Sequence, residues 1–257
     1  MTLPPTYVLT NPRRPSLTVE TLGALPHVAF VADDKPLPPG TSLSKLYSTL
    51  NVQGHYNVFR AHQAMARRFL AEHPDAPLGF FFEDDATPAV PNWLEVVRNA
   101  VLWKETLGPE LEVFFLYGRM FQAFRFQSIG QFLHRDVLRL RSDVPASESD
   151  YGGKHHVYGS LAYLMTRQAA QRFADMPWEG IPVDVILPDR FNFAFLNPSP
   201  FLHDRSQGSI IENTLKSERG KRHDPSYRVP LTKAEATESS AALDALIQPP
   251  PQAPNYG

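Results

Sequence analysis

Cysteine is absent from the 257 residues of this chain. Without thiolates, a disulfide framework, a cysteine zinc site, an iron–sulfur cluster and a cysteine nucleophile are all excluded. Any metal must therefore be bound by oxygen or imidazole. An excess of one charge is also missing, because 25 basic and 27 acidic residues leave a formal net charge of −2. The chain as a whole is not expected to attract polyanions, so any basic patch is local.

Long hydrophobic runs are missing too. No run approaches the roughly 18 apolar residues that a membrane-spanning helix needs, and the N-terminus lacks the pattern of a signal peptide. We therefore expect no membrane span and a cytoplasmic location, or the host cytoplasm if the source is a virus. Proline is abundant, with 25 residues, which indicates many fixed turns between short elements. The 42% of apolar residues is enough for the core of one large domain.

Strand and helix patterns alternate along the first half of the chain. Strands are predicted at 7–10, 27–32, 79–82 and 113–117, and helices at 51–72 and 92–107. Continuous apolar runs without alternation are typical of strands that are covered on both faces. The predicted fold is therefore α/β, with a mainly parallel central sheet flanked by helices and ligands bound beyond the carboxyl ends of the strands.

The second half of the chain adds one more strand and one more helix to this prediction. The strand is expected over 158–165, and Thr166 is placed to cap a helix over 167–176. We expect a single domain over 1–230. The segment 231–257 contains three consecutive prolines and is predicted to be a flexible, proline-rich tail.

Three consecutive acidic residues, Glu83, Asp84 and Asp85, follow the apolar run 79–82. Like charges this close disfavour one another unless a cation is present. Mg²⁺ or Mn²⁺ suits such a site, because these ions take one or two carboxylates together with water and substrate phosphates. The alternative is that the acidic residues only solvate a turn. The pair at 33–34 is a second acidic candidate, ranked lower because prolines follow it.

Five segments together resemble glycosyltransferase family 25, which includes the lipooligosaccharide and collagen galactosyltransferases. They are the opening strand with Asn11 and Arg13-Arg14, the helix after Gly54, the run 80–86, the strand 115–118 and the run 158–165. The resemblance covers roughly residues 5 to 215. One departure is the start of the first long helix, where only Gly54 of the family's usual pattern is kept. His62 lies a turn or two further on.

The resemblance implies a GT-A type fold and transfer of a sugar from a nucleotide-sugar donor, with a UDP-sugar as the first expectation and usually with Mn²⁺. The metal then stabilises charge on the leaving diphosphate. Carried over by position, the implied metal ligands are Asp85, Glu83 and His203. The implied donor-binding residues are Thr10, Asn11, Arg13, Arg14, Glu83, Asp84, Arg205 and Ser209. Arg13 and Arg14 also fit a solvated loop, and His203 also fits an exposed pair with its neighbouring aspartate.

An inverting transfer, which the resemblance implies, needs a base that takes the proton of the acceptor hydroxyl. Asp184 is the first candidate, because it lies among apolar residues in the segment 182–186, where burial raises the pKa of a carboxyl group. Asp189 is the second candidate. Either residue also fits an ordinary helix cap near Pro188.

The acceptor is less defined. Phenylalanines and arginines interleave between 119 and 141, a pattern that suits stacking on nucleic-acid bases as well as packing under a sheet. The candidate acceptor residues are Arg119, Phe124, Arg125, His156 and Tyr158. A saccharide or lipopolysaccharide acceptor is placed first and hydroxymethylated bases of DNA second. A binding module without transferase activity is the non-enzymatic alternative.

Overall fold

The computed structural model describes residues 3–10, 28–31, 36–37, 39, 52–120, 126–141 and 157–203. Its helices are α2 (Val52–Glu72), α3 (Trp93–Thr106), α4 (Arg167–Ala174) and α5 (Val183–Arg190). Its strands are β1 (Thr6–Thr10), β2 (Val28–Val31), β3 (Leu78–Phe82), β4 (Ala86–Pro88), β5 (Val113–Phe115), β6 (Arg119–Met120), β7 (Phe126–Phe132), β8 (Arg135–Leu140), β9 (Val157–Tyr158), β10 (Ala162–Thr166), β11 (Phe193–Asn197) and β12 (Phe201–His203).

Eight of these strands form one central sheet in the order β2-β1-β3-β10-β5-β11-β8-β7. Strands β2, β1, β3, β5 and β11 run in one direction, as the predicted parallel sheet requires. The predicted α/β fold with a mainly parallel sheet flanked by helices is confirmed. Strand β10 is the main departure, since it runs antiparallel between β3 and β5. Its first residues therefore lie beside the last residues of its two neighbours.

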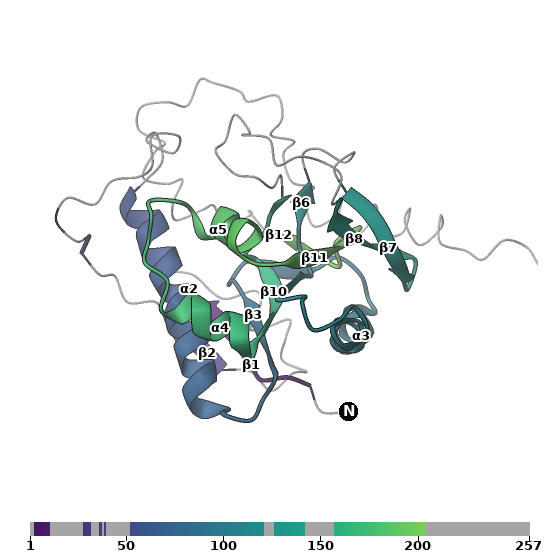
Figure 1. Ribbon diagram of the computed structural model, residues 1–257, viewed down its shortest axis with the longest axis horizontal. Coiled ribbons are helices and arrows are strands. Elements are labelled where there is room, and N and C mark those ends of the chain that lie inside the picture. The colour runs from purple at the N-terminus through teal and green to yellow at the C-terminus, as the bar shows by residue number, and fades with distance from the viewer. Residues whose placement is uncertain are drawn as a thin grey trace, which may run out of the picture.

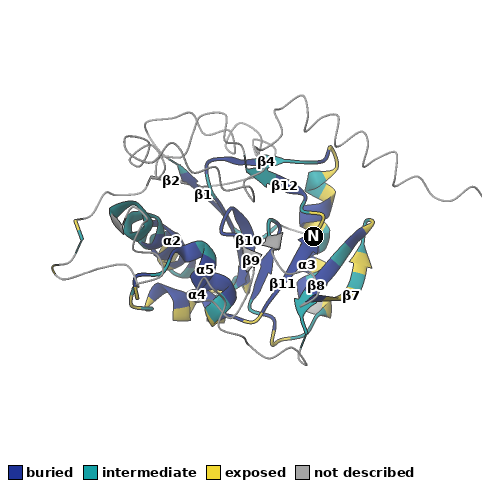
Figure 2. Cartoon of the chain, turned by 90° about the horizontal axis from the view of Figure 1, so that it is seen from above, coloured by how far each residue is buried: buried dark blue, intermediate teal, exposed yellow. Residues whose placement is uncertain are grey.

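The central strands are buried on both faces, and every residue of β3 is buried, as its continuous apolar run predicts. One face carries a row formed by Tyr7, Phe81, Tyr163 and Phe115, which pair in register across four strands. Helices α2, α4 and α5 cover this face, and α3 covers the other (Figure 1). Figure 2 shows the central strands buried, with exposed residues on the outer side of α4 and on β7.

Helix α2 forms where the apolar spacing predicts it. Ala61, Met65 and Phe69 recur at intervals of four residues and are buried against the sheet. Two polar residues of this helix, His62 and Gln63, are also buried, at 0% and 1% exposure. Gln63 donates hydrogen bonds to the carbonyls of Phe173 and Met176. In the described part of the chain, no helix is long and apolar enough to cross a membrane.

Two small antiparallel sheets lie beside the central one. In one of them β12 pairs with β4, which places His203 opposite Ala86. In the other β9 pairs with β6, which places Tyr158 opposite Arg119. The strand predicted over 158–165 is thus two strands, β9 and β10, interrupted at 159–161.

We predict that Thr166→Ala lowers the free energy of unfolding by about 1 kcal/mol, the usual value of an N-cap. The Thr166 side chain accepts a hydrogen bond from the Ala169 amide at 3.2 Å, so the substitution leaves this amide without its cap. Urea unfolding measures the change, and Thr166→Ser is expected to restore most of it. The matched control is Thr106→Ala, because Thr106 is exposed and only donates to the Leu102 carbonyl within its own helix. Equal effects of the two alanine variants would contradict the assignment.

Candidate functional site at the carboxyl edge of the sheet

The acidic run Glu83-Asp84-Asp85 begins directly after β3, at the carboxyl edge of the parallel strands. The Glu83 amide donates to the Leu161 carbonyl at 2.9 Å, and the Ala86 amide donates to the Glu83 carbonyl at 3.2 Å, which closes a tight turn. Asp84 and Asp85 are each only 6% exposed. A solvated surface turn does not bury its carboxylates to this degree, so simple solvation does not account for Asp84 and Asp85.

Asp85 and His203, two of the predicted metal ligands, lie in contact. His203 Nε2 is 2.8 Å from Asp85 Oδ2, although 118 residues separate them in the sequence. The pairing of β12 with β4 produces this contact, because it sets His203 beside the residue that follows Asp85. Asp85 is nearly buried and His203 is one-quarter exposed. The pair therefore has one side toward solvent.

Glu83 is held by two partners from other segments. Ser160 Oγ donates a hydrogen bond to Glu83 Oε1, and His62 Nε2 lies 3.3 Å from the same oxygen. Burial acts to raise the pKa of Glu83, but His62 and the Ser160 hydrogen bond outweigh it and lower the pKa to about 2. Glu83 is therefore a carboxylate at neutral pH, and its side chain keeps 22% of its exposure.

Gly159 explains how Ser160 reaches this position. A Cβ at Gly159 would lie 2.3 Å from the carbonyl oxygen of Tyr117, so only glycine lets the backbone pass this close. The Gly159 amide also lies 3.4 Å from the Asp184 carbonyl, which ties the segment to α5. The next residue, Ser160, is then directed at Glu83.

Asp184 lies in the first turn of α5 and is half-buried. Burial and the neighbouring charge of Glu83 raise the pKa of Asp184 to about 6, which confirms the predicted direction. Asp189 lies in the last turn of the same helix, where its carboxylate is 3.4 Å from Arg190 Nε. Five residues of helix turn the two side chains toward different sides, so Asp184 and Asp189 do not share one site.

The structure does not assemble the full set of metal ligands that the sequence predicts. Within the ranges that the structure describes, no three His, Asp or Glu side chains form a cluster suited to a metal ion. Asp85 and His203 are in contact, whereas Glu83 Oε1 is engaged by Ser160. A carboxylate and an imidazole are a donor set that Mn²⁺ accepts when water and phosphate oxygens complete its coordination. The metal stays a prediction, and two of its three predicted ligands, Asp85 and His203, are in contact.

Several predicted binding residues lie outside the described residues: Asn11, Arg13, Arg14, Phe124, Arg125, His156, Arg205 and Ser209, as well as Asp33-Asp34 and the tail 231–257. Their roles, and the division into a domain over 1–230 and a tail, stay predictions.

Of the remaining predicted binding residues, Thr10 is described. Because Val8 pairs with Phe82, Thr10 lies two residues beyond, at the same edge as the acidic run. Arg119 and Tyr158 are neighbours in the small sheet of β6 and β9.

Part of the stretch from 119 to 141 is structural. Phe126 is buried in the core, and Phe132 packs edge-on against Trp103 at a centroid distance of 6.2 Å. Arg135 is 3% exposed and donates to the Leu133 carbonyl, and Arg139 lies 3.3 Å from Glu110. For Phe126, Phe132 and Arg135 the packing interpretation is correct, whereas Arg139 forms an ion pair at the surface.

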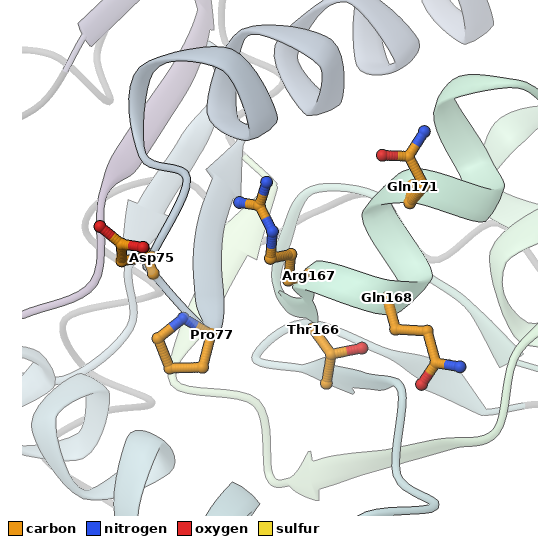
Figure 3. Close-up of a pocket in the computed structure, with 7 residues that line it drawn as sticks. Asp75, Pro77, Thr166, Arg167, Gln168 and Gln171 are labelled. Carbon is orange, nitrogen blue, oxygen red and sulfur yellow. The ribbon is translucent and has the colours of Figure 1, made fainter.

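An open hollow elsewhere on the molecule is lined by Asp75, Pro77, Thr166, Arg167 and Gln171 among others (Figure 3). Leu78, which follows Pro77, pairs with Thr166 at the start of β3. The hollow is therefore at the opposite edge of the sheet from Glu83. None of the predicted site residues lines it.

Sequence reasoning missed His62, Ser160 and Tyr163 as members of the site. His62 is fully buried, and its Nδ1 lies 2.8 Å from the hydroxyl of Tyr163, which is 1% exposed. A signal was present in the sequence, because His62 follows directly on the buried position Ala61 of the apolar stripe. This position does not show by itself that His62 belongs to the site, because a histidine on a helix is more often a core or surface residue without a catalytic or binding role.

Comparison with known proteins identifies no family. No family model matches the sequence, and no curated protein matches it. The resemblance to glycosyltransferase family 25 therefore stays a prediction. Among solved structures, A197 from STIV is 11% identical, with a TM-score of 0.37 over 78% of this chain and 85% of that one. A glycosyltransferase involved in the glycosylation of the major capsid of PBCV-1 is 8% identical, with a TM-score of 0.36 over 75% and 81%. At these scores the function has to be argued from the site itself.

We predict that Asp184→Asn stabilises the protein at high pH. The raised pKa means that between pH 4 and pH 6 the folded protein keeps a proton that the unfolded chain has released. Stability is therefore lost as the pH rises through this window, and above it a charged carboxylate is held near Glu83 at a cost of up to about 3 kcal/mol. The asparagine variant removes this cost.

Urea unfolding at pH 8 and pH 4 measures the effect. The gain from Asp184→Asn is expected at pH 8 and is expected to disappear at pH 4, where the carboxyl group is protonated. Asp175→Asn is the control, because Asp175 is exposed and accepts a hydrogen bond from Gln171 at the surface. A destabilised Asp184→Asn variant at pH 8 would show that the carboxylate is satisfied rather than strained.

Proposed function

We propose that this protein is a metal-dependent glycosyltransferase that moves a sugar from a nucleotide-sugar, with UDP as the nucleotide, to a hydroxyl group of an acceptor. The contact between Asp85 and His203 carries the proposal. It joins a nearly buried carboxylate to an imidazole at the carboxyl edge of the parallel strands, which is where ligands of such sheets bind. The carboxylates of Glu83 and Asp184 extend the site beyond this pair.

The proposed metal is Mn²⁺ or Mg²⁺, with Asp85 and His203 as its protein ligands. When bound, the ion would stabilise the negative charge that develops on the leaving diphosphate. Only two protein ligands are required, because such ions commonly complete their coordination with water and phosphate oxygens. His203 is one-quarter exposed, which leaves the pair accessible to a ligand from solvent.

Asp184 is the proposed general base. In the transfer, the acceptor oxygen forms a bond to the anomeric carbon, the bond from that carbon to the diphosphate breaks, and Asp184 takes the proton of the acceptor hydroxyl. A carboxyl group whose pKa lies at about 6 is a better proton acceptor than an ordinary aspartate and is still ionised at neutral pH. Transfer by this route inverts the anomeric configuration.

Glu83 is better suited to sugar than to metal. Its Oε1 already accepts from Ser160, so the carboxylate is fixed rather than available to move onto an ion. A fixed, partly exposed carboxylate is a good acceptor for a sugar hydroxyl. We therefore propose the donor sugar as the ligand of Glu83 and leave Asp184 for the chemical step.

The proposed acceptor is a saccharide or a lipopolysaccharide. The packing of Phe126, Phe132 and Arg135 into structural contacts removes part of the basic and aromatic stretch from a nucleic-acid surface, and Arg139 is paired with Glu110. Modified DNA is kept as the alternative acceptor, and a module that binds nucleotide-sugar without transfer is the non-catalytic alternative.

We predict that the purified chain releases UDP slowly from UDP-glucose or UDP-galactose in the presence of Mn²⁺, and that Asp85→Ala reduces this release at least about 100-fold, as expected for loss of a catalytic electrostatic group. A coupled assay for nucleoside diphosphate measures the rate. Asp136→Ala is the matched control, because Asp136 accepts hydrogen bonds from Ser128 and Gln131 on the exposed side of the β7–β8 hairpin. If Asp85→Ala keeps full turnover, the proposed metal site is wrong.

Acceptor class is tested by comparing an oligosaccharide mixture with duplex DNA that contains hydroxymethylcytosine. We expect sugar incorporation into the oligosaccharide and none into the DNA. Any DNA binding is expected to be weak at 200 mM salt, because non-specific binding rests on phosphate contacts that salt screens. Incorporation into DNA would reverse the order of the two acceptors. Binding of nucleotide-sugar, seen as thermal stabilisation, with no turnover on any acceptor would favour the binding module.

A further inference from the structure

A chain of polar contacts runs from the core of the sheet to Glu83. The hydroxyl of Tyr163 lies 2.8 Å from His62 Nδ1, and His62 Nε2 lies 3.3 Å from Glu83 Oε1. Tyr163 and His62 are fully buried, whereas Glu83 is partly exposed. This series of polar contacts thus begins in the apolar interior and ends at the carboxylate that faces the proposed substrate.

The side chains around Tyr163 and His62 are apolar and closely packed. The ring of Tyr163 stacks on Phe81 at a centroid distance of 5.3 Å and on His62 at 5.8 Å. Tyr163 is also fixed by strand pairing with Phe81 on one side and Phe115 on the other. A polar group is costly to bury in such a place unless it is hydrogen-bonded, so an apolar residue would serve packing better at either position.

The Glu83 carboxylate and the Tyr163 hydroxyl together determine which nitrogen of His62 carries the hydrogen. When the Tyr163 hydroxyl donates to Nδ1, the hydrogen of a neutral imidazole must be on Nε2, where it faces Glu83. A doubly protonated imidazole also has a hydrogen on Nε2. The third arrangement, with the hydrogen on Nδ1 alone, would set a nitrogen lone pair against a carboxylate and is disfavoured. The Glu83 carboxylate therefore favours an N–H group on Nε2, and the Tyr163 hydroxyl is the hydrogen-bond partner of Nδ1 in both allowed forms.

We propose that His62 and Tyr163 are positioning residues that hold the Glu83 carboxylate in the orientation in which it accepts a hydrogen bond from a hydroxyl of the donor sugar. This inference rests on the proposed glycosyltransferase function and adds to it the residues that fix the sugar-contacting group. Ser160 supports the same oxygen from the other side, and Glu83 touches the sugar. His62 and Tyr163 act only through Glu83.

The 3.3 Å between His62 Nε2 and Glu83 Oε1 agrees with such a role. It is longer than an ordinary N–H···O hydrogen bond of about 2.9 Å. Nε2 is buried and makes no hydrogen bond of good geometry to any described residue. Catalytic hydrogen bonds are often long without substrate and shorten when it binds. When a sugar hydroxyl binds the Glu83 carboxylate that Ser160 already fixes, the contact from His62 Nε2 to Glu83 Oε1 is expected to shorten into a hydrogen bond.

The test measures kcat/KM for release of UDP from UDP-glucose and UDP-galactose with Mn²⁺. His62→Gln is expected to lower kcat/KM by about 10- to 100-fold and Tyr163→Phe by about 3- to 10-fold, the values of charged and neutral hydrogen bonds. Glu83→Gln is expected to lose at least as much as His62→Gln. The double variant of His62→Gln and Glu83→Gln is expected to be no worse than Glu83→Gln alone, because His62 acts through Glu83.

The matched control is Tyr7→Phe. Tyr7 lies in the same row, stacks on the other side of Phe81 at 6.0 Å and donates its hydroxyl to Glu72 rather than toward the site. Tyr7→Phe is expected to lower stability as much as Tyr163→Phe and to leave kcat/KM unchanged. If both variants lose stability and neither loses activity, Tyr163 is structural and the inference is wrong.

Sugar analogues separate positioning from a general loss of structure. A set of UDP-sugars is prepared in which each member lacks a different hydroxyl group. For one member, the wild type and Glu83→Gln are expected to have the same kcat/KM, because that sugar lacks the hydroxyl that would bind Glu83. His62→Gln is expected to converge with the wild type on the same analogue. Convergence of the two variants on different analogues, or on none, would overturn the inference.

A histidine ¹⁵N–¹H NMR spectrum tests the tautomer without any donor. The His62 signals are identified by their loss in His62→Gln, and a hydrogen on Nε2 is expected. A hydrogen on Nδ1 alone would overturn the inference whatever the activity. If the wild type releases UDP from no nucleotide-sugar, the proposed function fails and this inference with it. If the wild type is active and the His62 and Tyr163 variants are equally active, only this inference fails.

Discussion

The carboxylate of Glu83 is the point at which three distant segments of the chain meet. It follows a fully buried strand, accepts a hydrogen bond from Ser160 before β10, and lies against His62 of α2. A charge placed at the end of an apolar strand needs partners, because burial alone would protonate it. His62 and Ser160 supply them and lower the pKa of Glu83. Burial, and after it the charge of the ionised Glu83, raises the pKa of Asp184, so the two carboxylates influence each other's protonation.

The antiparallel course of β10 makes this meeting possible. A parallel strand in the same place would bring its last residues to the carboxyl edge, whereas β10 brings its first ones. The residues just before Ala162 are thereby set beside the acidic run, and Gly159 passes the Tyr117 carbonyl where no larger residue fits. The antiparallel course of β10 thus brings the Ser160 side chain to Glu83, although the strand that follows Ser160 is part of the core.

Much of the fold is predictable from local patterns, and the site is predictable only in part. The buried strand 79–82, the stripe on α2 and the Thr166 cap depend on residues close in sequence. The acidic run and the raised pKa of Asp184 are also predictable, because each follows from its apolar surroundings. The antiparallel β10 and the contact of Asp85 with His203 depend on pairing between segments that are far apart in the sequence, 118 residues for Asp85 and His203, which periodicity does not encode. His62 is the clearest case, because only the fold shows that it faces Glu83.

Stability and function oppose each other at this edge. Two carboxylates near each other, with a buried histidine and tyrosine beneath them, cost free energy that leucine or phenylalanine would not. Elsewhere the same row of the sheet is filled by Phe81, Phe115 and Phe195, which pack without polar partners. Among the described residues, Glu83, Asp84, Asp85 and Ser160 gather where the parallel strands end, and Asp184 lies nearby where α5 begins. Several charged groups are thus concentrated at one edge of an otherwise apolar sheet, at a cost in stability. A site for ligand chemistry requires such groups, whereas selection for stability alone would replace them with apolar residues.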